Sequence, residues 1–201
     1  MQYLNSFFDL RCSMDVLKAT GPVKNLPKEI TESMGILKIL KSIILKTDRK
    51  FNMIDLCAGN SLTSVLAAHM YPNLKCIAMD KKERLKAQFN LVRNFSFVMC
   101  DIFKFPLSVS KSTIIISVHP CKRLAVECIN VFNNSDACHL IIMPCCGGQV
   151  TDQRHQFLKS KLGAYFAWTY ALSDMCVGKV SIRQDNNILS PKNLIIHARK
   201  K

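Results

Sequence analysis

Short, continuous apolar runs alternate with longer segments of helical periodicity from residue 51 onward. Because few polar residues interrupt these runs, they are typical of strands that are buried on both faces of a parallel sheet. The predicted strands span residues 51–57, 75–80, 96–102, 113–119 and 139–145, and the predicted helices span 61–70, 81–93, 122–132 and 153–162. This alternation predicts an α/β fold with a doubly wound, Rossmann-like sheet.

Both ends of the chain depart from this alternation. Residues 177–184 and 193–198 are strand-like and only a loop separates them, so we expect an antiparallel pair at one edge of a seven-stranded sheet. At the other end, residues 28–46 have helical spacing after Pro27, and earlier apolar residues suggest another short helix (Leu4, Phe7, Phe8 and Cys12). We therefore expect a helical extension over residues 1–50, followed by the main domain over residues 51–201.

Length and charge narrow the range of functions. A chain of 201 residues is long enough for one domain with a full core. Its 28 Lys and Arg against 14 Asp and Glu give a net charge of +14, which attracts polyanions, above all nucleic acid. The longest apolar runs, 113–118 and 140–143, are too short to cross a bilayer, and the charged start of the chain is unlike a signal peptide. We expect a cytoplasmic protein without a membrane partner.

The cysteines do not indicate a disulfide framework. There are ten, most of them within apolar runs, where cysteines of a reducing compartment are small buried hydrophobes. No Cys-x-x-Cys pair occurs, so the spacing signals no structural zinc site and we expect no metal.

The stretch DLCAGNS, residues 55–61, directly follows the first predicted strand. Ligands of doubly wound sheets bind beyond the carboxyl ends of the strands, so this turn is the natural ligand loop. Gly59 permits a close backbone approach, and Asn60 or Ser61 can cap the helix that follows. Two further strand-end acids, Asp80 and Asp101, stand where carboxylates can meet the ribose and the base of a nucleoside. The three acids together favour a nucleoside-containing cofactor over ordinary turn residues.

These segments, with CIAMD, VMCDIF and the final strand pair, resemble the class I S-adenosylmethionine-dependent methyltransferases over residues 51–201. That family has an acidic-x-Gly-x-Gly-x-Gly loop, and Cys57, Gly59 and Ser61 stand at its glycine places. The resemblance implies that S-adenosylmethionine is the cofactor. It places Asp55 and Gly59 at the methionine part, Asp80 at the ribose and Asp101 at the adenine, with Asn60, Lys81 and Ile102 beside them.

A finer resemblance involves SVHPCKRLA (117–125) and MPCCGG (143–148). These segments are similar to a branch that carries His-x-Cys-Gly after the fourth strand and Cys-Cys before an aromatic residue or histidine after the fifth. The branch includes tRNA 2'-O-methyltransferases of the acceptor stem. Lys122 stands at its glycine place, and Gly147 and Gly148 stand at its aromatic or histidine place.

The implied catalytic group is His119, Cys121, Cys145 and Cys146, which end the fourth and fifth strands. His119 could orient or deprotonate an acceptor hydroxyl or amine, since an imidazole titrates near neutrality. Alternatively, a thiolate could attack a pyrimidine, helped by the neighbouring positive charges. The three thiols and the imidazole could also bind a metal, or the small residues could simply let the backbone pass close to the cofactor.

Lys122 and Arg123 are the predicted substrate-binding residues, because they could hold a phosphate beside this site. Other basic residues gather in short clusters (Lys81, Lys82, Arg84 and Lys86; Lys159 and Lys161; Arg199 to Lys201). We therefore expect a methyltransferase that acts on RNA, such as tRNA. The alternatives are a methyltransferase for a protein or a small molecule, and a non-catalytic RNA-binding module that keeps the fold.

Overall fold

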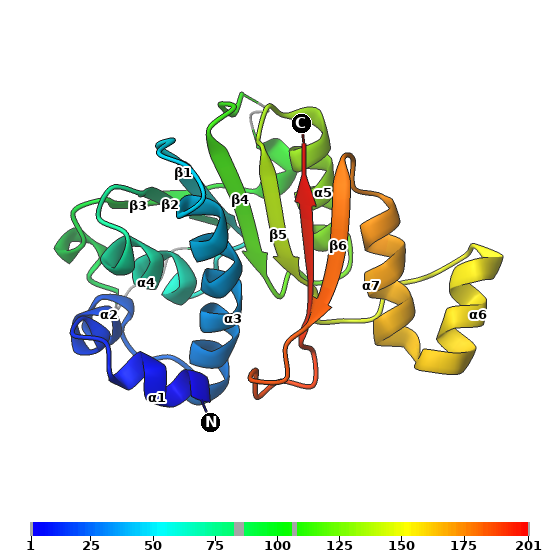
Figure 1. Ribbon diagram of the computed structural model, residues 1–201, viewed down its shortest axis with the longest axis horizontal. Coiled ribbons are helices and arrows are strands. Elements are labelled where there is room, and N and C mark those ends of the chain that lie inside the picture. Colours follow the sequence, from blue (N-terminus) through cyan, green and yellow to red (C-terminus); the bar gives the residue numbers. More distant parts are fainter. Residues whose placement is uncertain (1, 83–86, 106–107, 201) are drawn as a thin grey trace.

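The computed structural model describes residues 2–82, 87–105 and 108–200 (Figure 1). Seven strands form one sheet in the order β3-β2-β1-β4-β5-β7-β6. They are β1 (Asn52–Leu56), β2 (Lys75–Asp80), β3 (Phe95–Met99), β4 (Thr113–Val118), β5 (His139–Met143), β6 (Lys179–Gln184) and β7 (Leu194–Arg199). The first five are parallel, and β7 lies antiparallel between β5 and β6. This confirms the predicted Rossmann-like sheet with its terminal antiparallel pair.

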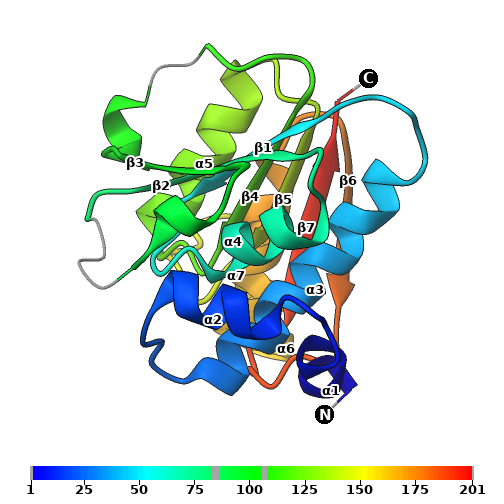
Figure 2. The ribbon, with the colours of Figure 1, turned by 90° about the vertical axis from the view of Figure 1, so that its left-hand side faces the viewer.

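Helices cover both faces of the sheet (Figures 1 and 2). On one face lie α1 (Gln2–Phe8), α2 (Ser13–Thr20), α3 (Leu26–Ile44) and α4 (Leu62–Met70), and on the other lie α5 (Arg123–Asn134) and α7 (Ala164–Asp174). The helix α6 (Gln153–Leu162) stands beyond α7 and has no buried residue. No helix among the described residues is long and apolar enough to cross a membrane.

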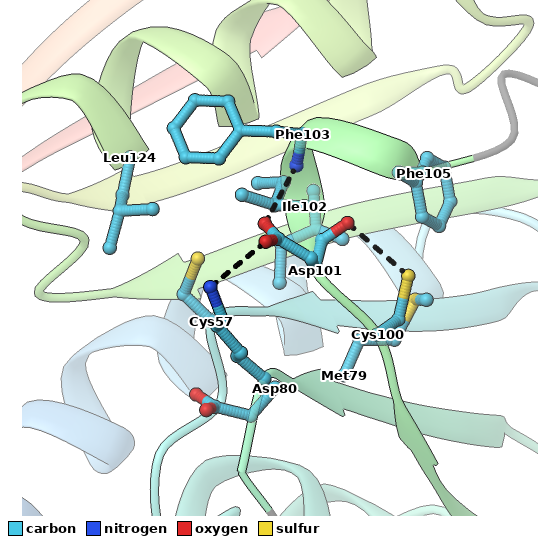
Figure 3. Close-up of a pocket in the computed structure, with 11 residues that line it drawn as sticks. Cys57, Met79, Asp80, Cys100, Asp101, Ile102, Phe103, Phe105 and Leu124 are labelled. Atoms are coloured by element: carbon cyan, nitrogen blue, oxygen red, sulfur yellow. Dashed lines mark hydrogen bonds and ion pairs between the residues drawn. The ribbon is translucent and has the colours of Figure 1, made fainter.

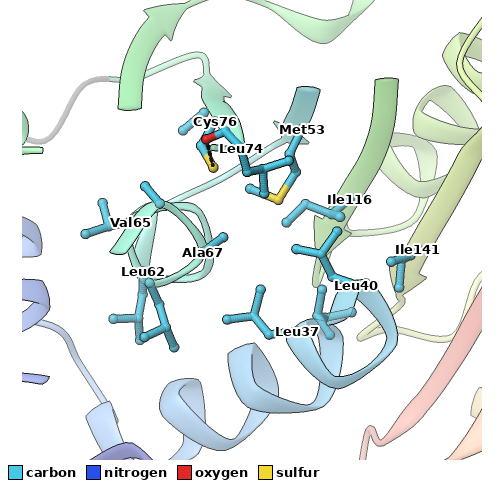
Figure 4. Close-up of a cluster of buried hydrophobic side chains, with 14 of the residues drawn as sticks. Leu37, Leu40, Met53, Leu62, Val65, Ala67, Leu74, Cys76, Ile116 and Ile141 are labelled. Atoms are coloured by element: carbon cyan, nitrogen blue, oxygen red, sulfur yellow. Dashed lines mark hydrogen bonds between the residues drawn. The ribbon is translucent and has the colours of Figure 1, made fainter. Parts of the chain in front are cut away.

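Strand periodicity divides the core into two clusters. Ile114 and Ile116 of β4 pack with the face of α1 to α4, whereas Ile115 between them packs with α5 and α7. Figure 4 shows Leu37 and Leu40 of α3 next to Ile116. The helix α3 therefore packs directly on the sheet, so its residues can reach the edge at which the strands end.

One predicted helix, residues 81–93, is wrong over its described part. Only a short 3₁₀ turn occurs, η1 (Phe89–Leu91), while residues 83–86, with Arg84 and Lys86, lie outside the described residues. The backbone makes local bonds within this turn, and it also bonds to a neighbouring helix, since Gln88 N–H donates to the carbonyl of Ala19 in α2 at 2.8 Å. The Asn94 side chain donates to the carbonyl of Leu74 at 2.7 Å. Helix α2 packs against α4 and η1.

The predicted strand 96–102 also ends earlier than expected. The strand β3 stops at Met99, and η2 (Ile102–Lys104) begins directly after Asp101. The Asp101 carboxylate accepts the backbone N–H of Phe103 at 3.2 Å, which caps this turn. The acid that seemed to close a strand therefore opens a 3₁₀ turn.

The turn before β6 gives a stability prediction. Gly178 has φ +89°, and a Cβ there would clash with the backbone carbonyl oxygen of Arg199. Gly163 has φ +87° but open space around its Cβ position. We expect Gly163→Ala to cost about 1–2 kcal/mol for the left-handed backbone alone, and Gly178→Ala to cost about 1–3 kcal/mol more from overpacking. Urea unfolding would measure both; equal losses would contradict the predicted clash.

Candidate cofactor and acceptor site

The loop after β1 has left-handed backbone at all three places that the resemblance assigns to glycine. Cys57, Gly59 and Ser61 have φ values of +58°, +55° and +61°. These are the three places at which the class I loop carries glycine, so the left-handed conformation is present where only one glycine remains. Left-handed backbone costs a residue with a Cβ roughly 1–2 kcal/mol. Such strain persists only where surrounding structure imposes it, and it concentrates at functional sites.

Asp80 ties this loop to the end of β2. Its Oδ2 accepts the backbone N–H of Gly59 at 2.9 Å, and its Oδ1 accepts that of Lys82 at 3.1 Å. On the far side of the loop, Asn60 Oδ1 accepts the N–H of Leu62 at 2.9 Å, which caps α4 as expected. The Asn60 amide also contacts Glu29 of α3. Asp80 and Asn60 therefore hold the loop from both sides.

A cavity of about 220 Å³ lies beside this loop, where β1, β2 and β3 end. Most of its wall is apolar, and two carboxylates, Asp80 and Asp101, are part of it (Figure 3). The lining residues are Leu56, Cys57, Met79, Asp80, Lys81, Cys100, Asp101, Ile102, Phe103, Phe105 and Leu124. An apolar slot with a few placed polar groups is typical of a nucleoside pocket. Five predicted cofactor residues thus meet in one cavity: Cys57, Asp80, Lys81, Asp101 and Ile102.

Lys81 and Asp101 form an ion pair across the cavity, with Nζ and Oδ2 separated by 3.1 Å. The ammonium of Lys81 and the N–H of Phe103 hold the pKa of the Asp101 carboxyl below its usual value. Asp101 is therefore an anion, able to accept a hydrogen bond from a base.

Asp55 lies beneath the loop and does not line the cavity. Its carboxyl group is buried, and Ser64 Oγ donates to Oδ2 at 2.5 Å. Oδ1 has no hydrogen-bond partner in the part of the chain that the structure describes. Burial raises the pKa of Asp55 to about 7, and the nearby Asp80 charge adds to this effect. An orphaned carboxylate oxygen at this place fits a cationic ligand such as the methionine part of S-adenosylmethionine.

The three predicted thiols meet where β4 and β5 end. The Sγ atoms of Cys121 and Cys145 are 3.1 Å apart, those of Cys145 and Cys146 3.2 Å, and those of Cys146 and Cys121 3.7 Å. We call these residues the thiol cluster. Burial and the two neighbouring thiols raise the pKa of Cys145 well above its usual range, which opposes a nucleophilic role for this residue.

The imidazole of His119 contacts a different partner. Its Nε2 lies 2.5 Å from Oε1 of Glu32, a residue of α3 whose side chain is only 1% exposed. Only the carbonyl of His119 faces the thiol cluster, where it accepts Cys145 Sγ at 3.5 Å. A tetrahedral site made of three thiols and this imidazole is therefore not formed.

Glu32 is a site residue that the sequence analysis missed. It also pairs with Lys28 Nζ at 3.0 Å. Burial acts to raise the pKa of Glu32, but the bonds from His119 and Lys28 outweigh it, and the pKa is lowered. The available signal was an acidic residue within the apolar stripe of a predicted helix, since a buried charge requires a partner.

Lys122 and Arg123 are exposed at the start of α5. The Arg123 guanidinium lies 5.4 Å from the ring centroid of Phe103, which lines the cofactor cavity. The two predicted substrate-binding residues therefore lie between the thiol cluster and this cavity.

Comparison with known proteins agrees with this geometry. Residues 27–153 match the family model of a methyltransferase domain. No curated protein sequence matches significantly. Among solved structures, the chain is similar to a SAM-dependent methyltransferase from Aquifex aeolicus, with a TM-score of 0.56 and 14% identity over 92% of this chain and 95% of that one.

Two other structures share the fold. Fibrillarin, in its complex with Nop5p, has a TM-score of 0.54 and 15% identity over 83% of each chain. Phosphoethanolamine N-methyltransferase 2 of Haemonchus contortus, in complex with S-adenosyl-L-methionine, has a TM-score of 0.55 and 12% identity over 89% of this chain and 45% of that one. The family match covers more than half of the chain, which therefore belongs to this methyltransferase-domain family and is an S-adenosylmethionine-dependent methyltransferase of class I fold.

Proposed function

We propose that this enzyme methylates RNA. The observation that carries the proposal is a basic groove at the amino ends of the parallel strands, opposite the cofactor cavity. Two adjoining hollows, the larger of about 1080 Å³, share the residues Thr47, Phe51, His139, Lys179 and Arg199. We call them together the amino-end groove.

Within the described part of the chain, seven basic side chains line the amino-end groove, against one carboxylate, Asp136. The basic residues are Lys46, Arg49, Lys111, Lys179, Arg183, Arg199 and Lys200. Among the described residues, none of the seven forms an ion pair with a carboxylate. Unpaired positive charge of this density is the electrostatic footprint of a phosphate backbone.

Aromatic surface accompanies these charges. His139 and His197 stack in the groove with ring centroids 5.3 Å apart, and Phe51 meets His139 edge to face. Burial and the neighbouring positive charges lower the pKa of both histidines to about 4. The rings are therefore neutral at physiological pH and offer surface on which a base can stack.

The groove and the methyl-transfer edge lie at opposite ends of the sheet. Strands of six residues such as β4 span roughly 20 Å, so a folded RNA can touch both ends at once. We propose that the groove positions the RNA, while Lys122 and Arg123 hold a phosphate close to the acceptor. A tRNA would suit this spacing, in line with the resemblance of the His119 and Cys145 segments to tRNA 2'-O-methyltransferases.

In this proposal, S-adenosylmethionine would supply the electrophilic methyl group, and residues of the protein would position it. Asp55, Gly59, Asn60 and Ser61 would hold the methionine part, and the cavity would hold the ribose at Asp80 and the adenine at Asp101. His119 would accept, at Nδ1, the proton that the acceptor loses, because Nε2 faces Glu32. Glu32 orients its imidazole, as a carboxylate does for a catalytic base.

RNA binding should depend steeply on salt. With about five phosphate contacts, log affinity should fall with log salt with a slope of about −4 to −5 on a duplex-like RNA, because counterions are released. The double variant Lys46→Gln, Lys179→Gln should make the slope less steep by about 2. Fluorescence anisotropy with a labelled tRNA at several salt concentrations measures both slopes.

The matched control is Lys18→Gln, Lys24→Gln, which removes the same charge from exposed positions on the α2 side. This variant should keep the original slope. If both double variants reduce the salt dependence equally, the net charge of the protein and not the groove accounts for RNA binding. Absent RNA binding, with methyl transfer to a protein or a small molecule, would overturn the proposal.

A further inference from the structure

The geometry of the thiol cluster points to a metal site that binds one thiophilic divalent cation, such as Zn²⁺, through Cys121, Cys145 and Cys146. This inference is independent of the RNA substrate. The three Sγ atoms converge from two separate loops, and the ligand atoms of the set all lie within 4.8 Å of one another. The sequence spacing gave no such signal, because the ligands are one isolated cysteine and one adjacent pair.

The distances fit a metal better than a set of separate thiols. Tetrahedral zinc with Zn–S bonds of about 2.3 Å separates its sulfur atoms by about 3.8 Å. The observed separations of 3.1, 3.2 and 3.7 Å lie slightly below this value, so a small outward movement would seat the ion. An adjacent Cys-Cys pair rarely points two thiols at one place, yet Cys145 and Cys146 do so here.

Electrostatics also favour a cation at the centre of the thiol cluster. Three thiolates at these separations would repel one another strongly. A cation at the centre removes this repulsion, and each ligating thiol then releases its proton to solvent. Lys122 and Arg123, which follow Cys121 directly, offset the net negative charge of three thiolates around a divalent ion.

The fourth position would be open. The imidazole of His119 is turned toward Glu32 and supplies no ligand, while Cys121 is exposed. Three protein ligands with one open position are the arrangement of exchangeable and catalytic zinc sites rather than of closed structural ones. The ion would join the loops after β4 and β5, and it would leave on treatment with a chelator.

Cobalt reports on such a site directly. The full-length protein, reduced and freed of metal by a chelator, is titrated with Co²⁺ without oxygen. We expect thiolate-to-cobalt charge-transfer absorption that saturates at one ion per chain, the visible bands of tetrahedral cobalt, proton release, and loss of these bands when Zn²⁺ is added.

Single variants locate the ion. Cys121→Ser, Cys145→Ser and Cys146→Ser should each lose the charge-transfer absorption, and Cys176→Ser, at the distant end of α7, should keep it. Circular dichroism confirms that each variant is folded, and a variant that does not fold is replaced by the corresponding Cys→Ala.

No absorption with the intact protein would overturn the inference. Charge-transfer absorption that survives all three variants would also overturn it, since another cysteine would then hold the ion. A disulfide within the cluster that persists under reductant would do the same.

Discussion

S-Adenosylmethionine should bind the purified protein, and Asp80→Ala should weaken that binding at least about 100-fold. The reason is that Asp80 has two tasks: it lines the cavity, and it accepts the N–H of Gly59 at 2.9 Å. Hydrogen bonds to a charged group contribute about 1.5–3 kcal/mol each, so the loss of two ribose contacts alone corresponds to at least about two orders of magnitude in Kd. Calorimetric titration of the cofactor measures the change.

The matched control is Asp9→Ala, which removes an exposed carboxylate at the end of α1. Its affinity for the cofactor should equal that of the unmodified protein. A thermal melt of Asp80→Ala without cofactor separates a lost contact from a lost fold. Unchanged affinity in a folded Asp80→Ala would show that the cofactor binds outside this cavity, and no binding by the intact protein would favour a non-catalytic module.

The free energy of unfolding should fall as the pH rises from about 4 to about 7, because of Asp55. The pKa of this buried carboxyl is about 7 in the folded protein, against about 3.9 for an unperturbed aspartate. A raised folded-state pKa means that the folded state binds more protons than the unfolded state over this interval, so stability declines with pH. A difference of three pKa units corresponds to roughly 4 kcal/mol.

Asp55→Asn tests this directly, since asparagine can still accept the hydrogen of Ser64 but does not titrate. The variant should lose this part of the pH dependence and should exceed the parent protein in stability at pH 8, as measured by urea unfolding across the pH range. Asp9→Asn should leave the profile unchanged. An identical pH profile for Asp55→Asn and the parent would contradict the prediction. The cationic cofactor favours the ionised carboxylate, so its affinity should rise through pH 7 in the parent only.

Local patterns predicted the elements well where local interactions decide the structure. The strand 75–80 and the helix 153–162 have the predicted bounds, because an uninterrupted apolar run and a polar helical segment each specify their own conformation. The predicted helix 81–93 is not formed in its described part, since α2 packs beside α4 at this place and Asn94 bonds to the end of α4. No window around residues 81–93 contains that information.

The candidate site could also be predicted only in part from local sequence patterns. The ends of the predicted strands indicated Asp80 and Asp101 as site residues, because parallel strands finish at one edge of a sheet, and Asp101 lies at this edge although β3 ends at Met99. Glu32 enters from a helix almost ninety residues before His119, and the direction of an imidazole depends on what packs against it. The amino-end groove could not be predicted from the sequence either, since its basic side chains come from four segments that only the folded sheet brings together: residues 46–49, 111, 179–183 and 199–200.

The left-handed residues Cys57 and Ser61 bear on how such loops are recognised. A sequence motif that requires glycine at all three places matches this loop at only one of them, Gly59. The backbone dihedral angles nevertheless show one common feature, because φ is positive at all three places. The loop is defined by its backbone conformation, and glycine is the residue that adopts this conformation with the least steric strain. A survey of positive φ values after a first parallel strand would therefore find methyltransferase domains that a letter-based motif passes over.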